Sequence, residues 1–236
     1  DLLLHLNSPE EREQLLANQG VDYLYLIDFT SHFSANTAAD FFEKYVKSLK
    51  AKVVVAGFDY HFGSDRREVH ELNQFFDGQI IIVPSINHEN EKISSTRIRK
   101  AIKEGCVAEA TQLLSYPFST RGIVVHGNAR GRTIGYPTAN LAPLDRVFLP
   151  ADGVYVVDVE HKGHKYRGMA SVGKNVTFDG EEARFEVNIF DFNQDIYGET
   201  VMVYWLDRIR DMRKFDSVDQ LVDQLKADEE VARNWS

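Results

Sequence analysis

Apolar and polar positions follow a different period in each half of the chain. In the first half, short apolar runs are separated by stretches in which apolar residues recur every three or four positions. Strands are therefore predicted at 22–27, 52–57 and 79–84, and helices at 8–20, 37–50, 95–105 and 107–114. The apolar runs at 52–57 and 79–84 are typical of strands buried on both faces of a parallel sheet. Strands alternating with helices predict a parallel, doubly wound α/β sheet.

The second half consists of short segments rich in Val, Ile, Tyr and Phe, separated by glycine-containing turns. These segments lie at 122–127, 153–160, 166–173, 184–192 and 199–206. They predict a small antiparallel barrel or sandwich. A final helix begins after Ser217, which forms a capping pair with Gln220. We therefore expect two domains, at 1–118 and 119–236.

Composition narrows the class of protein. The chain has 236 residues and a net charge of −9, which argues against a general nucleic-acid binder. Cys106 is the single cysteine, so no disulfide forms within the chain, as expected in a reducing cytoplasm. No apolar run approaches the roughly 20 residues of a membrane span. We expect a cytoplasmic protein whose partners are small molecules, with no nucleic acid and no membrane.

The stretch that begins after the strand at 122–127 combines glycines, arginines and two side-chain oxygens. Glycines let the backbone approach a ligand closely, and arginines bind anions. Thr138 and Asn140 lie on one side of an extended segment and can ligate Mg²⁺ together with nucleotide phosphates. The candidate phosphate-binding residues are Gly127, Arg130, Gly131, Arg132, Gly135, Pro137, Thr138 and Asn140. A glycine-rich hairpin without a ligand is the alternative interpretation.

Two further motifs lie in the first half. "ISSTRIR", at 93–99, opens a helix with hydroxyl and guanidinium groups, which suits a triphosphate but also an ordinary capped helix. "GFDYHFG", at 57–63, follows a strand at the sheet edge where ligands bind in α/β folds. Its aromatic residues provide a wall for a planar ring or pack into the core.

In the segment "RFEVNIF", Phe185, Val187 and Ile189 fall on one face of a strand. The opposite face carries Glu186 between a basic and an amide residue. Glu186 is a candidate general base if that face looks into a site, and a solvent-facing residue otherwise.

With these motifs in place, the chain resembles the prokaryotic bifunctional riboflavin kinase/FMN adenylyltransferases, also called FAD synthetases. "GIVVHGNARGRTIGYPTANL" is very similar to the family's flavokinase signature. "LPADGVYVV", "FEVNIFDFNQDIYG" and "RIRDMRKFDSVDQL" resemble the later flavokinase blocks, in the same order. "GFDYHFG" and "ISSTRIR" resemble blocks of the adenylyltransferase module. The resemblance implies a Rossmann-like nucleotidyltransferase domain, followed by a riboflavin-kinase β-barrel and a C-terminal helix.

The resemblance also implies roles for individual residues. In the barrel, the loop with Gly131 and Gly135 covers the ATP phosphates, and Thr138 and Asn140 hold Mg²⁺. Glu186 takes the proton from the terminal hydroxyl of riboflavin, and Arg210 lies in a flap over the flavin. In the first domain, the residues implied to bind ATP phosphates are Ser95, Thr96 and Arg99. The residues implied to lie near the flavin of FMN are Asp59 and Phe62.

The expected reactions are the phosphorylation of riboflavin to FMN and the adenylylation of FMN to FAD, both with ATP. The family's adenylyltransferase module opens with an H-x-G-H loop, and the first domain of this sequence contains none. We therefore expect the first domain to be incomplete at its start. Two alternatives stay open: a riboflavin kinase whose first domain is structural or regulatory, and a flavin-binding module without catalysis. Glu186 distinguishes a kinase from the flavin-binding module, because a protein that only stores flavin needs no general base.

Overall fold

The computed structural model describes residues 4–127, 130–177 and 180–236 of the chain. Its contacts group the chain into two compact units. One unit contains Ser94–Ser236 together with the chain up to Gln19, and the other is Gly20–Ile93. Residues 94–118 therefore pack with the predicted barrel domain rather than with the strands that precede them. In the part of the chain that the structure describes, no helix is long and apolar enough to cross a membrane.

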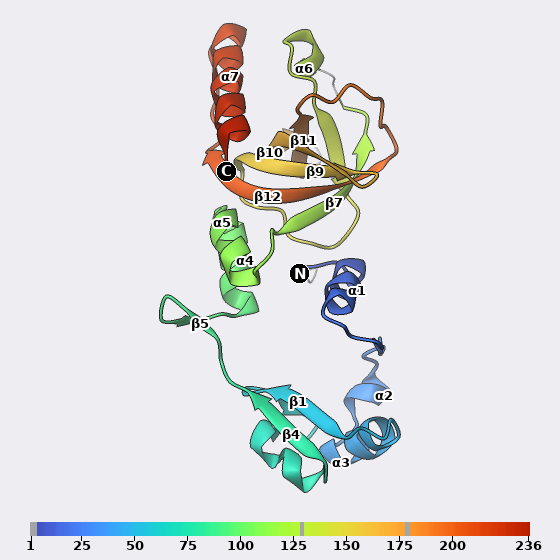
Figure 1. Cartoon of the computed structure of the whole chain (residues 1–236). Coiled ribbons are helices and arrows are strands. Elements are labelled where there is room, and N and C mark those ends of the chain that lie inside the picture. The colour runs from blue at the N-terminus through green and yellow to red at the C-terminus, as the bar shows by residue number, and fades with distance from the viewer. Residues whose placement is uncertain (1–3, 128–129, 178–179) are drawn as a thin grey trace. The chain divides into compact units, whose positions relative to one another are not determined.

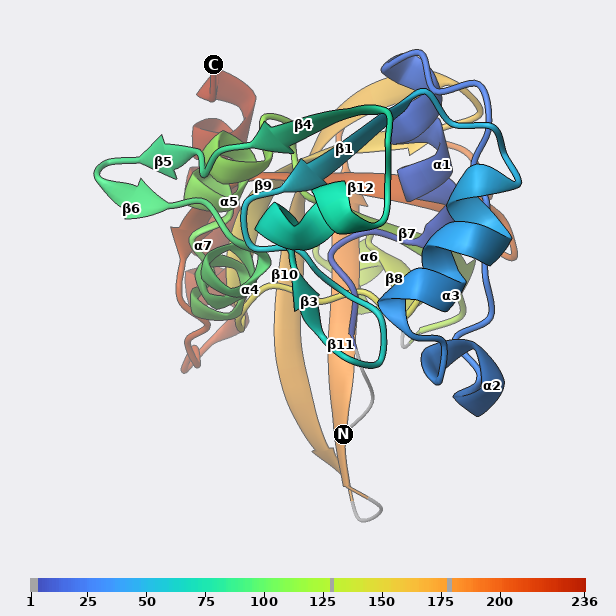
Figure 2. The same ribbon diagram turned by 90° about the horizontal axis from the view of Figure 1, so that it is seen from below.

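The larger unit is built around a closed barrel of antiparallel strands (Figure 1). Around the barrel the strands follow the order β10-β11-β8-β7-β12-β9. Their bounds are Ser119–Val125 for β7, Ala139–Pro143 for β8, Gly153–His161 for β9, His164–Thr177 for β10, Gly180–Ile189 for β11 and Thr200–Arg210 for β12. Strands β10 and β11 run side by side as a long hairpin (Figure 2). The predicted small antiparallel barrel is confirmed.

Alternating apolar residues of the barrel strands fill its interior. Tyr155, Val157 and Trp205 are fully buried, and Val156, on the other face of β9, is buried in the cluster that also contains α7 residues. The ring of Trp205 stacks on Phe185 with centroids 5.2 Å apart. Its Nε1 donates a 2.9 Å hydrogen bond to the Thr120 hydroxyl. The one polar atom of this large side chain is thereby paired inside the core.

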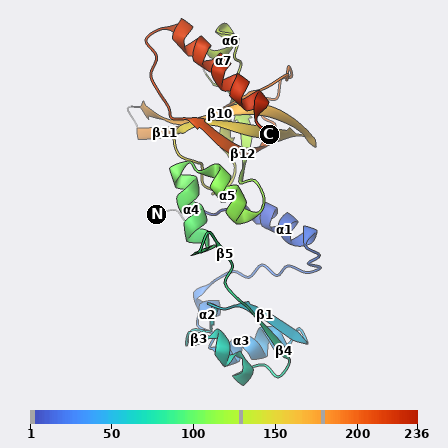
Figure 3. The same ribbon diagram turned by 60° about the vertical axis from the view of Figure 1, so that its left-hand side comes forward.

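Helix α7 (Val218–Asn234) packs across β10 and β9 (Figure 3). The Ser217 side chain accepts a hydrogen bond from the Gln220 backbone N–H at 3.2 Å, which confirms the predicted N-cap. The Gln220 side chain, however, accepts from the backbone of Asp216. Leu225 and Ala232 belong to the apolar cluster between helix and barrel.

Three further helices of this unit begin where the sequence predicts, and a fourth, the single-turn α6, is not predicted from the sequence. Helix α1 (Pro9–Asn18) has Ser8 as N-cap and a capping box with Glu11. Helix α4 (Ser95–Glu104) ends at Gly105, whose φ of 80° is the left-handed conformation that favours glycine. Helix α5 (Val107–Leu114) packs against α4 and β12 (Figure 3). Helix α6 is a single turn, Arg130–Thr133.

The smaller unit contains two parallel strands, β1 (Val53–Gly57) and β4 (Gln79–Val83), which lie side by side (Figure 1). Short helices flank them: α2 (Ser31–Ser34), α3 (Ala38–Phe41), the π-helix η1 (Phe42–Lys47) and the 3₁₀-helix η2 (Val69–Gln74). Two small hairpins complete the unit, β2–β3 (His61–Phe62 and Arg67–Glu68) and β5–β6 (Asn87–His88 and Glu91–Lys92). Its core contains Ala38, Phe42, Ala56, Phe62, Val69, Leu72 and Phe76.

Two sequence predictions about this unit are wrong. Residues 22–27 form no strand, and Tyr23 and Leu26 are about four-fifths exposed. Strands β1 and β4 pair in parallel as predicted, but Val55 is 60% exposed rather than buried. A strand is stable only when neighbours satisfy its backbone and cover its faces. The sequence pattern indicates that these residues are apolar enough to be buried. They are buried only where other elements pack on both faces of the strand.

Candidate active site

A cavity of about 520 Å³ on the barrel unit is lined by residues from the segment around α6, from strands β9, β10 and β11, from the end of β12 with the chain that follows it, and from α7. The segment around α6 contributes Gly131 and Thr138, and β11 contributes Glu186. Arg210 comes from the end of β12, and Leu225 from α7. The first four of these residues were singled out from the sequence. They lie up to 79 positions apart along the chain, from 131 to 210, and the closed barrel brings them to one cavity.

The glycine-rich segment folds as a tight loop closed on Gly131. The carbonyl oxygen of Gly131 accepts backbone hydrogen bonds from Ile134 at 3.2 Å and from Tyr136 at 2.9 Å. A Cβ on Gly131 would overlap the carbonyl oxygen of Tyr136, so this position requires glycine. Gly135 has a φ of 83°, the left-handed conformation that favours glycine. The Arg130 side chain lies outside the described part of the structure.

A polar residue of β11 fixes the end of this loop. Asn188 on β11 donates its side-chain amide to the carbonyl oxygen of Pro137 at 2.5 Å. Thr138 follows directly and lines the large cavity as well as a smaller one. Asn140 lies opposite Glu186 in the β8–β11 pairing, and opposite residues of an antiparallel pair share a face. Thr138 and Asn140 are thus both held near the predicted base.

The oxygens at this place suit a magnesium ion that is bound mainly through phosphates. A Cβ on Gly127 would overlap the side-chain amide of Asn140, so the backbone there leaves room that Asn140 fills. Mg²⁺ prefers oxygen ligands and is usually held by one or two protein groups plus substrate phosphates. Among the described residues no three His, Cys, Asp or Glu side chains group as a metal cage. The hydroxyl oxygen of Thr138 and the amide oxygen of Asn140 fit a site in which one or two protein groups and the substrate phosphates hold Mg²⁺.

Glu186 lines the large cavity with its strand neighbours Arg184 and Asn188, as the alternation along the strand predicts. Its side chain is 16% exposed, and Oε1 lies 2.8 Å from Nη2 of Arg184. This ion pair restricts the rotation of the carboxylate. The carboxylate therefore faces a cavity, rather than open solvent, and can accept a proton there.

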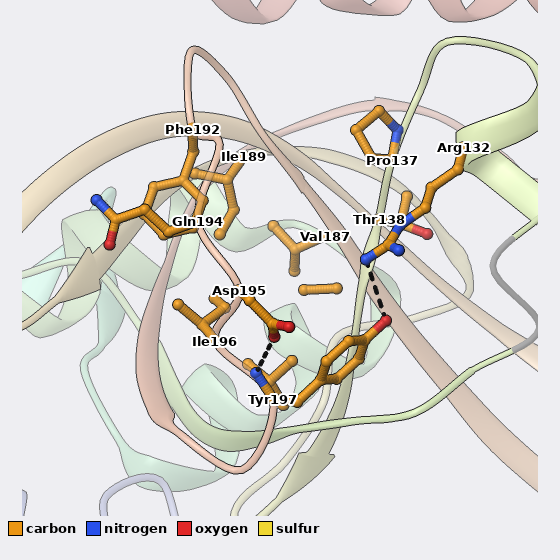
Figure 4. Close-up of a pocket in the computed structure, with 12 residues that line it drawn as sticks. Arg132, Pro137, Thr138, Val187, Ile189, Phe192, Gln194, Asp195, Ile196 and Tyr197 are labelled. Carbon is orange, nitrogen blue, oxygen red and sulfur yellow. Dashed lines mark hydrogen bonds between the residues drawn. The ribbon is translucent and has the colours of Figure 1, made fainter.

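A smaller cavity of about 80 Å³ lies on the other side of Thr138 (Figure 4). Its wall is apolar where Val187 and Ile189 project from β11, and aromatic at Phe192 and Tyr197. The other residues that line it are Val124, Arg132, Pro137, Ala139, Gln194, Asp195 and Ile196. Strand β11 thus presents alternate residues to two different cavities.

Sequence reasoning missed the aromatic part of this smaller cavity. Arg132 donates a hydrogen bond from Nη2 to the Tyr197 hydroxyl at 3.3 Å (Figure 4). The imidazole of His126 stacks on the Tyr197 ring with centroids 3.9 Å apart. Arg132, predicted as a phosphate ligand, therefore also orders an aromatic wall. Phe192 and Tyr197 lie just beyond the apolar run of β11, where the sequence has no periodic signal.

Arg210 lines the cavity and is held by helix α7. It forms an ion pair with Asp228, whose side chain is fully buried. Tyr136, which also lines the cavity, donates a hydrogen bond to Glu229 at 3.1 Å, and burial raises the pKa of Tyr136. Sequence reasoning missed both helix residues, because an acidic residue on a helix is usually solvent-exposed.

The N-terminus of α4 carries the predicted ATP-binding residues of the other site. The Ser94 side chain accepts a 3.2 Å hydrogen bond from the backbone N–H of Arg97, so Ser94 caps the helix. Ser95 and Thr96 are exposed, and Arg99 is half-buried one turn further on. The helix end therefore combines an ordinary cap with exposed hydroxyl groups.

In the smaller unit, Asp59 is exposed and accepts a hydrogen bond from Lys92 Nζ at 2.6 Å. This hydrogen bond lowers the pKa of Asp59. Lys92 also lies over the Phe58 ring, 4.4 Å from its centroid. Phe62, by contrast, is 3% exposed and packs in the core of the unit, where Tyr60 stacks on it. The exposed rings of this loop are those of Phe58 and Tyr60 rather than Phe62.

Comparison with known proteins accounts for almost the whole chain. Residues 114–236 match the riboflavin kinase family, and residues 2–97 match the FAD synthetase family. The chain is 41% identical to the bifunctional riboflavin kinase/FMN adenylyltransferase of Listeria monocytogenes serovar 1/2a, over 97% of this chain and 74% of the relative. It is 35% identical to the Bacillus subtilis (strain 168) enzyme of the same name, over 94% of this chain and 72% of the relative.

A solved structure shares the fold throughout. It is titled a macrolide-efflux protein from Streptococcus pneumoniae, and it is 70% identical with a TM-score of 0.96. The match covers 100% of this chain and 77% of that one. The word efflux in that title describes the other protein. On the two matched families and the named relatives, this chain belongs to the bifunctional riboflavin kinase/FMN adenylyltransferases.

Proposed function

We propose that the barrel unit transfers the γ-phosphoryl group of ATP to riboflavin in the large cavity. The observation that carries this proposal is the meeting of Gly131, Thr138, Glu186 and Arg210 at one cavity. Phosphoryl transfer needs a loop over the phosphates, a cation, and a carboxylate that accepts a hydroxyl proton. The terminal ribityl hydroxyl attacks the γ-phosphorus as the bond to the β–γ bridging oxygen breaks. ADP leaves, and Glu186 receives the hydroxyl proton.

Thr138 lines both cavities, and we assign ATP to a position that extends from one cavity to the other past this residue. The apolar and aromatic wall of the small cavity suits a purine, with Phe192 and Tyr197 beside the ring. The phosphates then pass Thr138 under the loop closed on Gly131. Thr138 and Asn140 would hold Mg²⁺ together with the phosphates, and the ion would supply charge neutralisation to the transferring group. Riboflavin occupies the large cavity near Arg210.

The second proposed reaction is adenylylation of FMN. In it, a phosphate oxygen of FMN attacks the α-phosphorus of ATP, and pyrophosphate leaves. Ser95, Thr96 and Arg99 are assigned to the ATP phosphates, because a helix N-terminus and a guanidinium favour anions. Asp59 is assigned to the FMN side, whereas Phe62, which is buried in the core of its unit, is not. Along the sequence we assign residues 1–118 to this reaction and 119–236 to the kinase, although residues 94–118 group with the barrel unit in the structure. Membership of a bifunctional family supports this assignment.

The test of the kinase proposal is Glu186→Gln. The amide keeps the size of the side chain but cannot accept a proton, so kcat for FMN formation should fall by about 10²- to 10⁴-fold. The KM for ATP should change little, because Glu186 is not assigned to ATP. FMN formation is followed by chromatography with the purified chain.

Glu160→Gln is the matched control, since Glu160 lies on β9 outside both cavity linings and accepts a hydrogen bond from the Tyr204 hydroxyl. A kinase rate within about twofold of wild type in Glu186→Gln contradicts the assignment of the base. Tight riboflavin binding without FMN formation by the wild type favours the flavin-binding module instead.

A further inference from the structure

Asp228 is a charged residue in a place where charge is costly. It lies on the inner face of α7, and its side chain is fully buried. Burying an isolated carboxylate is strongly unfavourable, so such a group is retained only with well-formed partners. Its main partner is Arg210: Nε lies 3.0 Å from both carboxylate oxygens, and Nη2 lies 2.7 Å from Oδ2. This two-armed contact fixes the plane of the guanidinium.

Arg210 keeps donors to spare after this contact. A guanidinium has five N–H groups. Nε and one N–H of Nη2 go to Asp228, and one N–H of Nη1 goes to the carbonyl oxygen of Asp211 at 3.0 Å. Among the contacts of the described residues, one N–H on each terminal nitrogen is left over. Because Arg210 lines the large cavity, these two donors sit on a group that is held rigidly at the cavity wall.

The same carboxylate also orders a second cation at the cavity. Gln224, one turn earlier on α7, donates a hydrogen bond to Asp228 Oδ1 at 2.6 Å and accepts one from Arg213. Arg210 and Arg213 both lie against the Phe215 ring, with Cζ 5.8 and 4.7 Å from its centroid. Two guanidinium groups around one ring repel each other unless a nearby anion offsets their charge. Asp228 is that anion.

We propose that Asp228 is a positioning residue for riboflavin. It holds the Arg210 guanidinium in one plane, so that the two remaining N–H groups donate to carbonyl oxygens of the isoalloxazine ring. Asp228 itself touches no substrate. The proposal rests on the assignment of riboflavin to the large cavity. A purely structural role, in which the ion pair fastens α7 to the barrel, predicts a loss of stability without a selective loss of riboflavin affinity.

The first measurement compares Asp228→Asn with wild type. An amide offers one acceptor oxygen in place of two and has no charge, so the two-armed contact with Arg210 is lost. Riboflavin Kd, measured by flavin fluorescence without ATP, should rise about tenfold. KM for ATP should stay within about twofold, and thermal unfolding should remain cooperative. Glu230→Gln, an exposed position on the same helix, is the control and should leave riboflavin Kd unchanged.

A double-mutant cycle decides whether Asp228 acts through Arg210. Arg210→Lys keeps a positive charge beside Asp228 but removes the planar donors, so riboflavin Kd should also rise about tenfold. Adding Asp228→Asn to Arg210→Lys should then change Kd by less than about twofold. A further tenfold rise in the double variant, or an unchanged Kd in either single variant, overturns the proposal. Should Asp228→Asn not fold, Asp228→Glu, which keeps the charge but displaces the carboxylate, replaces it in the cycle and is judged by the same criterion.

The design separates this proposal from the kinase assignment. Wild type that binds riboflavin but forms no FMN refutes the kinase proposal, whereas the Asp228 proposal is still judged on Kd. Wild type that forms FMN while Asp228→Asn keeps its riboflavin Kd refutes the Asp228 proposal alone. Absence of riboflavin binding by wild type refutes both.

Discussion

Gly127 shows how one missing side chain shapes the proposed magnesium site. The space next to its Cα is filled by the amide of Asn140, which a Cβ on Gly127 would overlap. The overlapping atoms belong to a side chain and not to backbone, so Asn140 can swing away at small cost to the fold. The backbone of Gly127 has no left-handed φ that would resist an alanine.

Gly127→Ala is therefore expected to weaken Mg-ATP binding about tenfold with little change in Tm. Titration calorimetry with Mg-ATP and a thermal melt measure the two effects. Gly57→Ala is the matched control, because its Cβ would meet no atom closer than Asp59 Oδ1 at 3.5 Å. An unchanged Mg-ATP affinity in Gly127→Ala would argue that Asn140 does not hold the metal. A large fall in Tm would mean that Asn140 cannot move.

Among the secondary-structure elements, β9 and β12 are joined by a charged cluster as well as by backbone pairing. Glu199 directly precedes β12, and its carboxylate lies 2.6 Å from Nε2 of the buried His161 at the end of β9. Lys162 Nζ lies 2.7 Å from the same oxygen. The hydrogen bonds from Lys162 and then His161 lower the pKa of Glu199.

This lowered pKa gives the cluster a defined pH dependence. A carboxyl group with a folded-state pKa below its unfolded value stabilises the protein above the unfolded pKa, near 4.5. That contribution is lost as pH falls through the folded-state pKa. Glu199→Gln should therefore lower Tm at pH 7, and the gap to wild type should close as pH falls below about 4. A gap that stays constant between pH 7 and pH 3 in melting scans would contradict this explanation.

Helix α7 has a comparable organising role for the site. Its consecutive residues Asp228 and Glu229 hold Arg210 and Tyr136, which line the large cavity from different segments. Neither contact follows from the helix sequence, since acidic residues occur throughout α7. The packing of the helix on β9 and β10 decides which of them turn inward.

For the whole molecule, the proposed function places two reactions in two different sets of residues. Arg99→Ala should reduce FAD formation from FMN by roughly 10-fold or more, because it removes a cation assigned to the ATP phosphates. FMN formation from riboflavin should stay within about twofold. Both products are measured from one reaction series. An equal loss of both activities would mean that Arg99 supports the barrel rather than a separate site.

The helices of this protein are determined largely by local sequence. The capping box of Ser8 and Glu11, the cap at Ser217 and the terminal Gly105 all occur where the sequence places them. Such signals work because they satisfy backbone groups within one turn of the chain. The alternation of apolar and polar residues in β11 likewise predicts that Glu186 and Asn188 share one face, and both line the large cavity.

Tertiary structure determined those features of the protein that depend on contacts between residues distant in the sequence. Residues 22–27 have a strand pattern and form none, because a strand needs a neighbour. Asp228 became a buried partner of Arg210 only through the packing of α7 on the barrel. The small cavity exists because β11, β7 and the chain after β11 meet around Thr138. Local patterns encode which faces and ends are apolar or polar, whereas only the closed barrel determines which of them meet.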